Sequence, residues 1–380
     1  MKRLEKYIDR SYSVISGEKG LEHLKTFKDF PVFFGCTDSS FKDDLYADMK
    51  WAIDPSTGII QLEKLIPLDI LYMEQHVDAT GETWRQYNND FSDYIVDNSE
   101  GNIIEIGGGA GKIANLILRK TKTNQEIIVV EPNPLFKEKK GLRIINSFFN
   151  KGLKEKLGSN NTVSFSQVFE HIYDPKGFLE EIYEFLPENG KLIFAYPNLE
   201  YWFNNKFTNA INFEHTLLMT DYYVDYLLKV SGFEIIEKKA YKNHSHFYNV
   251  KKTEKTPQLS LKNKYKHYKN MFEDFISYHN DLVREINIKT KNQSELFLFG
   301  GHIFSQFLIQ FGLDVSNLEY VLDNSPLKIN KRLYGTELQV KSPAILAEYK
   351  APTVILKAGV YNDEIKKDIL ENINPNTKFI

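Results

Sequence analysis

The sequence predicts an α/β protein with two tandem doubly wound domains behind a small N-terminal α+β module. From about residue 101 onward, short β-branched or apolar runs alternate with amphipathic helical patterns, and the alternation starts again after a polar, basic stretch at 252–264. Such alternation is typical of βαβ units, which form a parallel sheet covered on both faces. The expected domains are an N-terminal module at 1–80, a middle domain at 81–255 and a C-terminal domain at 256–380.

The N-terminal module is predicted to contain one helix and one hairpin. Residues 20–30 have the apolar spacing of a short amphipathic helix. Two apolar runs surround a turn at Pro55–Gly58, which is a hairpin signal. Residues 81–98 then show aromatic and aliphatic side chains at helical spacing, which predicts a longer helix at the start of the middle domain.

The two larger domains each consist of predicted strands and helices in a regular order. In the middle domain, strands are expected at 102–107, 126–132, 142–148, 162–169 and 191–197, with an antiparallel pair at 233–241 and 244–252. The intervening helices are expected at 112–120, 151–157, 176–186 and 220–232. In the C-terminal domain, a long polar helix at about 260–290 precedes strands at 295–301, 318–324, 338–340, 351–359 and 376–380, and helices at 304–312, 342–349 and 361–373.

Composition excludes several classes of protein. The chain has 48 Lys and Arg residues against 51 Asp and Glu residues, so it lacks the basic excess of a DNA-coating protein. Its single cysteine, Cys36, excludes a disulfide framework and a cysteine-based zinc site. The charged first residues lack the apolar core that a signal peptide is expected to have, and no run of about 18 apolar residues predicts a membrane helix. We therefore expect a soluble, cytoplasmic, multi-domain protein that has neither a nucleic-acid nor a membrane partner. The sequence leaves its oligomeric state open.

The strongest motif is a glycine loop, Glu105-Ile-Gly107-Gly-Gly109-Ala-Gly111, which follows a predicted strand and opens a helix. Glycines allow a ligand to lie against bare backbone, and the first turn of a helix presents free N–H groups. A phosphate-binding P-loop requires Gly-x-x-x-x-Gly-Lys-Ser/Thr, and this segment lacks both the first glycine and the hydroxyl residue. The dinucleotide fingerprint Gly-x-Gly-x-x-Gly fails at its last position, which is Lys112.

A second acid, Glu131, ends the next predicted strand, roughly 20 residues after the loop, where a carboxylate can accept hydrogen bonds from both ribose hydroxyls of a nucleoside. Together with Glu131, the spacing Glu-x-Gly-x-Gly-x-Gly resembles motif I of the class I S-adenosylmethionine (SAM) methyltransferases, which have a Rossmann-like fold. The resemblance implies SAM as the cofactor. It also implies a cofactor-binding site made of Glu105, Gly107, Gly109, Gly111, Glu131, Pro132, Ser147, Phe148 and Gln167.

Three further segments extend the resemblance. Residues 165–175, which contain Glu-His and Asp-Pro pairs, resemble motif II of the same enzymes. Residues 323–336 and 358–365 resemble two runs found in the sugar C-methyltransferases of nucleotide-sugar biosynthesis. Members of that family join a zinc-binding N-terminal module, a SAM domain and a C-terminal Rossmann-like domain that helps to hold the substrate. The resemblance therefore implies methyl transfer to a nucleotide-linked sugar, and it covers nearly the whole chain.

Methylation of a keto sugar at carbon requires a base that removes the acidic α-proton, and histidine is the commonest such base. The resemblance implies that the pair Glu214-His215 carries this role, with His171 as a second candidate. No metal ligands are assigned, because the histidines lack a convincing ligand spacing, and the sequence leaves open whether a metal assists. The residues expected to contact the substrate are Tyr72, His76, Asn198, Asn212, His244 and His246.

The sequence departs from this family in two regions. The zinc cysteines are absent, so the N-terminal module is expected to hold together through its hairpin and aromatic packing. The family's tyrosine three residues before the catalytic histidine is Asn212 here. Sugar O-methylation on the same scaffold and a non-catalytic SAM-binding role therefore remain as alternatives. The run Gly300-Gly301-His302, followed by Asp323, mimics a dinucleotide site but has too few glycines for one.

Overall fold

The chain forms two compact units. The computed structural model describes residues 2–72, 81–121, 125–158, 161–255 and 259–380. The first unit comprises residues 1–77, 200–218 and 263–380, and the second comprises residues 78–199 and 219–262. The predicted middle domain therefore corresponds to the second unit, except that residues 200–218 group with the first. The predicted division into three domains stays a prediction. Within the described ranges, no helix is long and apolar enough to cross a membrane.

The second unit is built around a seven-stranded sheet with the order β10-β9-β8-β11-β12-β14-β13. Its strands are β8 (Ile103–Ile106), β9 (Ile127–Val130), β10 (Leu142–Ile145), β11 (Thr162–Ser166), β12 (Lys191–Pro197), β13 (Phe233–Tyr241) and β14 (Ser245–Lys252). The first five strands of this order pair in parallel, and β14 and β13 are antiparallel additions, as the sequence predicts. The strand order reverses between β8 and β11, and open α/β sheets bind ligands at such a switch point.

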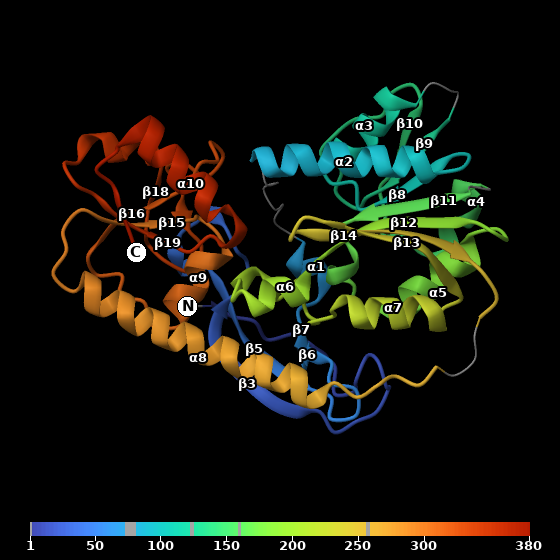
Figure 1. Ribbon diagram of the computed structural model, residues 1–380, viewed down its shortest axis with the longest axis horizontal. Helices are drawn as coiled ribbons and strands as arrows, with labels where there is room; N and C mark the ends of the chain where they lie inside the picture. The colour runs from blue at the N-terminus through green and yellow to red at the C-terminus, as the bar shows by residue number, and fades with distance from the viewer. Residues whose placement is uncertain (1, 73–80, 122–124, 159–160, 256–258) are drawn as a thin grey trace. The chain divides into compact units, whose positions relative to one another are not determined.

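Helices cover both faces of this sheet (Figure 1). On one face lie α2 (Glu82–Asn98) and α3 (Lys112–Lys120), and on the other lie α5 (Pro175–Phe185) and α7 (Asp221–Val230). Shorter elements are η2 (Lys151–Leu153), α4 (Lys154–Leu157) and η3 (Phe169–His171). All helices that the sequence predicts for the middle domain are therefore present.

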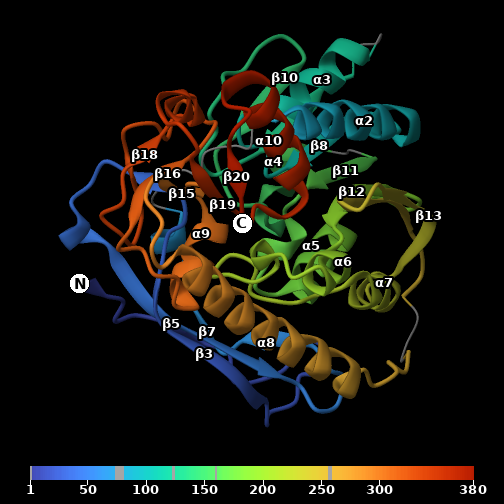
Figure 2. The ribbon, with the colours of Figure 1, turned by 60° about the vertical axis from the view of Figure 1, so that its left-hand side comes forward.

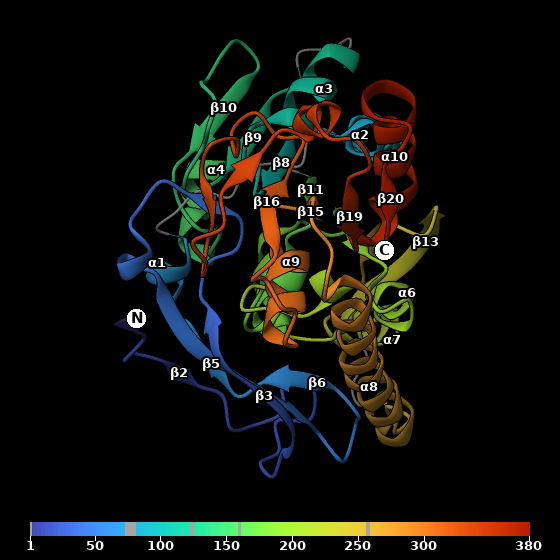
Figure 3. The same ribbon diagram turned by 90° about the vertical axis from the view of Figure 1, so that its left-hand side faces the viewer.

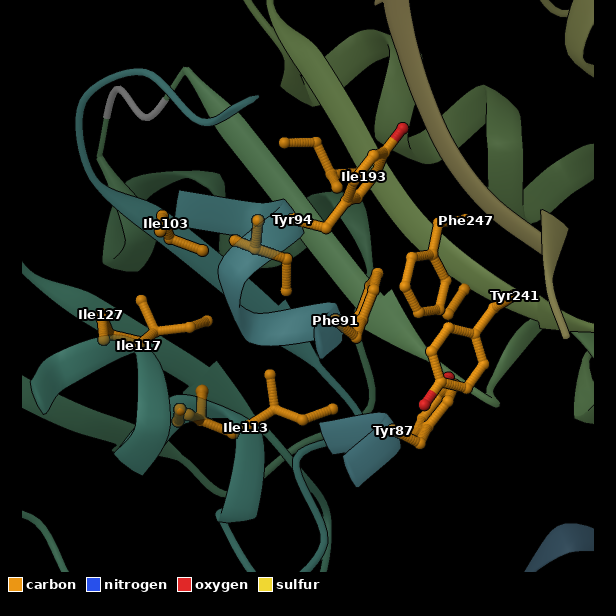
Figure 4. Close-up of a cluster of buried hydrophobic side chains, with 14 of the residues drawn as sticks. Tyr87, Phe91, Tyr94, Ile103, Ile113, Ile117, Ile127, Ile193, Tyr241 and Phe247 are labelled. Carbon is orange, nitrogen blue, oxygen red and sulfur yellow. The ribbon is translucent and has the colours of Figure 1, made fainter. Parts of the chain in front are cut away.

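The core beneath α2 is rich in aromatic side chains (Figure 4). Tyr87 and Phe91 of α2 are fully buried and pack with Ile193 of β12 and Phe247 of β14. The rings of Tyr87 and Phe91 stack with centroids 6.2 Å apart, and those of Tyr241 and Phe247 with centroids 5.0 Å apart. Burying a large apolar side chain contributes about 1.5–3 kcal/mol. This packing fixes α2, and any polar atom that it carries, against the sheet.

The N-terminal part of the first unit is mainly β-structure. It contains a sheet of β1 (Lys2–Arg3), β3 (Glu22–Pro31), β5 (Leu45–Ile53) and β6 (Ile60–Leu62), and a separate pair of β2 (Ile8–Asp9) and β7 (Lys64–Leu65). Two short helices are η1 (Phe41–Asp43) and α1 (Leu68–Leu71). Strands β5 and β6 form the antiparallel hairpin that the sequence predicts.

One prediction for this module is wrong: the helix expected at 20–30 is instead the strand β3 (Glu22–Pro31). Phe27 and Phe30 are both buried, although side chains three residues apart normally point to opposite faces of a strand. Between them the pairing with β5 shifts register, and Asp29 has a positive φ of 50°. A bulge of this kind adds a residue to one strand and so returns Phe30 to the buried face. The resulting spacing of three resembles a helical period.

Two turns of the module are joined by hydrogen bonds to Asp54. The turns run over residues 13–17 and 54–58, and in each the last N–H donates to the first carbonyl, at 2.9 and 2.8 Å. Ser16 Oγ and Thr57 Oγ1 both donate to Asp54 Oδ2, at 2.9 and 2.7 Å. Burial raises the pKa of Asp54, but hydrogen bonds from Ser13 and Thr57 outweigh it and leave the pKa lowered. These hydrogen bonds stabilise the N-terminal module in addition to the hairpin that the sequence predicts.

The C-terminal part of the first unit is a parallel sheet with the order β18-β16-β15-β19-β20 (Figure 3). Its strands are β15 (Leu296–Phe299), β16 (Leu318–Leu322), β18 (Val340–Lys341), β19 (Thr353–Leu356) and β20 (Lys378–Phe379). Its helices are α8 (Tyr265–Thr290), α9 (Ile303–Gln310), η5 (Pro343–Glu348), η6 (Gly359–Tyr361), α10 (Asn362–Asp368) and η7 (Ile369–Ile373). Helices α8 and α9 pack on one face and α10 on the other, which confirms the second doubly wound domain.

The long helix α8 also packs against the N-terminal sheet (Figure 2). Tyr265 Oη and Lys269 Nζ near its start contact the Glu22 carboxylate of β3 at 2.5 and 2.7 Å. Phe272, one turn further on, lies against Trp51 of β5 with ring centroids 6.5 Å apart. The segment 200–218, with α6 (Leu199–Asn204) and η4 (Thr208–Ala210), completes this unit.

A buried ion pair links the N-terminal part to the C-terminal part of the first unit. The Arg332 guanidinium donates to both carboxylate oxygens of Asp44, at 2.7 and 2.6 Å. Arg332 is 8% exposed and Asp44 is fully buried. Gly335 N donates to the same carboxylate at 2.8 Å. Beside the pair, β17 (Arg332–Leu333) is antiparallel to β4 (Cys36–Thr37), so the connection combines charge with backbone pairing.

We expect Asp44→Asn to destabilise the first unit by about 3–5 kcal/mol, because it leaves the buried Arg332 charge without a carboxylate. The midpoint of thermal unfolding, followed by circular dichroism, measures the loss. The matched control is Asp43→Asn, which removes an exposed pair with Lys2 and should leave the midpoint unchanged. Equal midpoints for Asp44→Asn and the control would show that the pair does not hold the unit together.

Candidate functional site

The glycine loop connects β8 to α3 at the carboxyl edge of the second unit's sheet. Gly107, Gly109 and Gly111 have positive φ values of 74°, 50° and 70°. A Cβ on Gly111 would lie 2.6 Å from the ring of Phe136, so a larger residue does not fit there. A Cβ on Gly109 would meet no atom within 4 Å, so this part of the loop faces open space. The loop therefore exposes bare backbone at the place where the sequence predicts a ligand.

Glu131 follows β9 and holds the loop in this shape. Gly109 N donates to Glu131 Oε2 and Asn133 N donates to Glu131 Oε1, both at 2.9 Å. Glu131 is 9% exposed, and Pro132 follows it in the turn. A carboxylate has about four lone-pair positions, so two remain for a ligand's hydroxyl groups. Its orientation is fixed before any ligand arrives.

Glu105, the first residue of the motif, is a buried acid on β8. Its side chain is 3% exposed, and its Oε2 atom has no hydrogen-bond partner among the described residues. Burial raises the pKa of Glu105 to about 8, and the nearby charge of Glu131 adds to the shift. A hydrogen bond from the backbone of Ala114 acts in the opposite direction. A cationic ligand beside this acid would favour its ionised form.

The remaining predicted cofactor residues lie after β10 and β11. Ser147 Oγ donates to the carbonyl of Phe148 at 2.9 Å, and the Phe148 side chain is 51% exposed. Its ring is therefore accessible for stacking. Gln167, after β11, has a positive φ of 53°, which is uncommon for a residue other than glycine. Its Nε2 donates to Tyr87 Oη at 2.9 Å and to Ser245 Oγ at 3.1 Å.

Three predicted substrate residues lie at the ends of β12 and β14. Asn198 N donates to the carbonyl of His244 at 3.0 Å, which joins these two strand ends. Burial lowers the pKa of His244 to about 4 and also lowers that of His246. Both imidazoles are therefore neutral near pH 7. His171, in η3, is half-buried beside Glu170, whose pKa burial raises to about 8.

The other predicted acceptor residues belong to the first unit. Asn212 Oδ1 accepts hydrogen bonds from the backbone of Glu214 and His215, at 2.7 and 2.9 Å. Thr216 O then accepts from Leu62 N at 2.9 Å, which ties the loop to β6. Glu214 is 4% exposed and His215 is half-buried. The Asn212 amide thus shapes the turn that presents the predicted catalytic pair.

Tyr72 is half-buried at the end of α1, where its N–H donates to the carbonyl of Leu68 at 3.0 Å. His76 lies outside the described residues. Arg10, which the sequence does not single out, is 2% exposed and donates to the carbonyl of Thr216 at 2.8 Å. Arg10 thus supports the loop that carries His215. No motif surrounds Arg10, and only the structure reveals its role.

The C-terminal sheet repeats the backbone geometry of the glycine loop but closes the equivalent site. Gly301 N donates to Asp323 Oδ2, and Ser325 N donates to Asp323 Oδ1, both at 2.9 Å. Here, however, Lys328 Nζ lies 2.9 Å from Asp323 Oδ2 and neutralises the acid. Cys36 Sγ lies 2.7 Å from the position of a Cβ on Gly301. The space beside this loop is therefore filled by the protein itself, which argues against a dinucleotide site.

We expect Glu105→Gln to change how the stability of the ligand-free protein depends on pH. The pKa of Glu105 is about 8 in the folded state, against an ordinary value of 4.5. The unfolded state therefore loses its proton at lower pH than the folded state. The stability of the wild type relative to the variant should fall as pH rises from 4.5 to 8 and stay low above that.

Thermal unfolding midpoints of the wild type and Glu105→Gln, measured between about pH 4.5 and 9, would test this expectation. That pH range covers the interval between the pKa of Glu105 in the unfolded and in the folded state. Glu155→Gln is the control, because Glu155 is an exposed acid of the same unit. The difference between wild type and the control should stay flat. A flat difference for Glu105→Gln as well would contradict a protonated Glu105.

Two family models match the sequence over the elements described above. Residues 75–248 match a methyltransferase domain, and residues 233–380 match a C-methyltransferase C-terminal domain. No curated protein sequence matches significantly.

Several solved structures are distantly similar. A SAM-dependent methyltransferase from Mesorhizobium loti is 9% identical, with 42% of this chain and 95% of that chain covered and a TM-score of 0.35. A SAM-dependent methyltransferase from Aquifex aeolicus is 10% identical, with coverages of 43% and 90% and a TM-score of 0.33. The CurJ carbon methyltransferase is 14% identical, with coverages of 44% and 54% and a TM-score of 0.35.

The family matches and the geometry of the loop agree with each other. The methyltransferase-domain match contains the glycine loop, Glu131 and Gln167, and the second match begins at β13 and continues through the C-terminal sheet. The chain therefore contains a SAM-dependent methyltransferase domain with the class I fold, and its C-terminal part is similar to the corresponding domain of C-methyltransferases.

Proposed function

We propose that this enzyme transfers the methyl group of SAM to a carbon atom of a nucleotide-linked keto sugar. The observation that carries the proposal is the match of residues 233–380 to a C-methyltransferase C-terminal domain. The resemblance of residues 323–336 and 358–365 to runs of the sugar C-methyltransferases supports the same substrate class. We include a cytoplasmic location in the proposal, because one cysteine in 380 residues fits a reducing compartment.

The proposed reaction needs a base and a methyl donor. The base removes the proton from the carbon beside the ketone, and the enolate that forms attacks the methyl carbon of SAM. A carbon–carbon bond forms, the carbon–sulfur bond breaks, and its electron pair stays on the sulfur of S-adenosylhomocysteine (SAH). The proton remains on the base until the product leaves. A positioned base contributes about 10²–10⁴-fold to the rate of such a step.

His215 and His171 are the proposed bases. His215 lies on a loop that is fixed at both of its ends: the Asn212 side chain holds its backbone N–H, and Thr216 pairs with β6. His171 lies in η3, directly after the strand end that carries Gln167. A rigid support favours both, because proton transfer depends on geometry first. Glu214 remains a proposed catalytic residue beside His215. The proposed substrate contacts remain Tyr72, His76, Asn198, Asn212, His244 and His246.

A small cavity in the first unit supports an anionic substrate. It has a volume of about 70 Å³, and its lining includes Lys206, Thr208, Lys357 and Asn362. Thr208 is 4% exposed, and its Oγ1 has no hydrogen-bond partner among the described residues. Burial lowers the pKa of Lys357, and the charge of Lys289 lowers it further. A phosphate group of the nucleotide would place a negative charge beside Lys357 and accept hydrogen bonds from Lys357 and Thr208.

Sugar O-methylation is the alternative that shares this scaffold. In that reaction the base removes a hydroxyl proton, and no ketone is needed. A non-catalytic SAM-binding role is the second alternative. Exchange of the carbon-bound proton separates C-methylation from both alternatives, because only C-methylation requires a base to remove it. Formation of a methylated product then separates O-methylation from a non-catalytic role.

We expect the wild type to exchange deuterium into a nucleotide-linked keto sugar in D₂O when SAH replaces SAM. The variant that lacks the true base, His215→Ala or His171→Ala, should lose both exchange and methyl transfer by about 10²–10⁴-fold. Mass spectrometry measures both. His23→Ala is the control, because His23 is exposed on β3. Undiminished turnover in both variants would overturn the base assignment, and a product with a new O-methyl group would favour the alternative.

We expect Lys357→Met to raise KM for the nucleotide sugar by about tenfold or more, because a hydrogen bond to a charged group is removed. The affinity for SAH, measured by calorimetry, should not change. Lys350→Met is the matched control, since Lys350 is exposed in the same domain. An unchanged KM would remove the cavity from the substrate site without affecting the cofactor assignment.

A further inference from the structure

Tyr87 is a buried tyrosine whose hydroxyl lies at the carboxyl edge of the SAM-domain sheet. The residue is fully buried in the core beneath α2 (Figure 4). Its Oη lies 2.8 Å from Ser166 Oγ and 2.9 Å from Gln167 Nε2. A buried hydroxyl is costly unless it is hydrogen-bonded, so both contacts contribute to holding Tyr87 in place. The sequence suggests only a core role for this residue.

Ser245 is the second support of the Gln167 amide. Ser245 Oγ lies 3.1 Å from Gln167 Nε2 and 2.6 Å from His244 Nδ1. Both N–H bonds of the amide are therefore used, one by Tyr87 and one by Ser245. With this arrangement Tyr87 donates to Ser166 and Ser245 donates to His244, so every contact joins one donor to one acceptor.

This network fixes the direction of the Gln167 carbonyl oxygen. Because both N–H groups are engaged, Oε1 points away from the two hydroxyls, and it has no hydrogen-bond partner among the described residues. The backbone of Gln167 is left-handed, a conformation that costs about 1–3 kcal/mol and persists only where its surroundings enforce it. A strained residue that presents an unused acceptor is a feature of ligand sites.

Gln167 lies beside the glycine loop. Strand β11 pairs in parallel with β8, so the segment that follows Phe165 emerges next to the one that follows Ile106. Val168 Cγ2 lies 2.5 Å from the position of a Cβ on Gly107, which shows how closely the two segments pack. The loop and the Gln167 amide therefore share one edge of the sheet.

The strand order indicates which part of SAM meets this amide. Along the edge, β10 carries Phe148, β9 carries Glu131, β8 carries the glycine loop and β11 carries Gln167. If adenine lies by Phe148 and ribose by Glu131, the methionine part of SAM lies by the glycine loop and β11. That part has one hydrogen-bond donor, its ammonium group. An amide oxygen is a suitable acceptor for it.

We propose that Tyr87 is a positioning residue of the donor site: together with Ser245 it orients the Gln167 amide so that Oε1 accepts a hydrogen bond from the ammonium group of SAM. The inference extends the assignment of the cofactor domain and is independent of the sugar substrate. It predicts that the hydroxyl of Tyr87 matters to ligands that carry the amino acid part of SAM and not to ligands that lack it.

The test compares the affinities of SAH and 5′-methylthioadenosine, which lacks the amino acid part. We expect Tyr87→Phe to weaken SAH binding by about threefold to tenfold, because one hydrogen bond that orients the amide is lost. Binding of 5′-methylthioadenosine should be unchanged. Isothermal calorimetry measures both ligands. The matched control is Tyr241→Phe, whose hydroxyl bonds to Asp90 at 3.0 Å in the same cluster and which should affect neither ligand.

Two further variants complete the test. Ser245→Ala removes the other support and should show the same selective loss, so it serves if Tyr87→Phe does not fold. In a Gln167→Ala background, Tyr87→Phe should have no further effect on SAH binding, because its action passes through the amide. Equal losses for both ligands, no loss for SAH, or a full effect of Tyr87→Phe in the Gln167→Ala background would each overturn the proposal.

Discussion

The hydrogen bond from Gly109 N to Glu131 Oε2 is the interaction on which the cofactor edge of this enzyme depends. It joins the segment after β8 to the end of its parallel neighbour β9. The bond satisfies a loop N–H and one oxygen of a buried carboxylate at once, and either group alone would be costly to bury. The same carboxylate also orders the next turn through Asn133. Loop and acid thus fix each other, and the site has its shape before SAM binds.

The C-terminal sheet shows that this bond alone is not sufficient for a cofactor site. Gly301 and Asp323 repeat it, with the same separation of 22 residues along the chain as Gly109 and Glu131. Only the surroundings differ: Lys328 neutralises the second acid, and Cys36 fills the space beside the second loop. Two similar folds in one chain therefore have different capacities, because function lies in the residues at the strand ends.

Local patterns were enough to predict both parallel sheets, the β5–β6 hairpin and the glycine loop, because each has a signal within a short stretch of sequence. Strand β3 could not be predicted in this way. Its bulge at Asp29 arises from pairing with β5, and it produces a spacing that belongs to helices. Tertiary pairing thus overrode the local pattern.

The residues that hold the candidate site in place were less predictable from the sequence than the site residues themselves. Tyr87 has the spacing of a core residue, and its packing does fill the core. Its hydroxyl gains a role only because α2 places it beside Gln167, 80 positions further along the chain. Ser245 and Arg10 are similar, since each acts on a residue that is distant in sequence. Contacts of this kind depend on the folded arrangement and leave no local signal.

The Asp54 cluster has a consequence for the conditions under which the N-terminal module persists. Ser13 and Ser16, like Asp54 and Thr57, occupy the first and fourth positions of glycine-closed turns, the spacing at which paired cysteines bind structural zinc. Here hydroxyl groups share one carboxylate instead. Oxidants and chelators, which dismantle thiolate–metal centres, have no target in these bonds. Strong acid would break these bonds, because protonating Asp54 removes the acceptor to which both turns are attached.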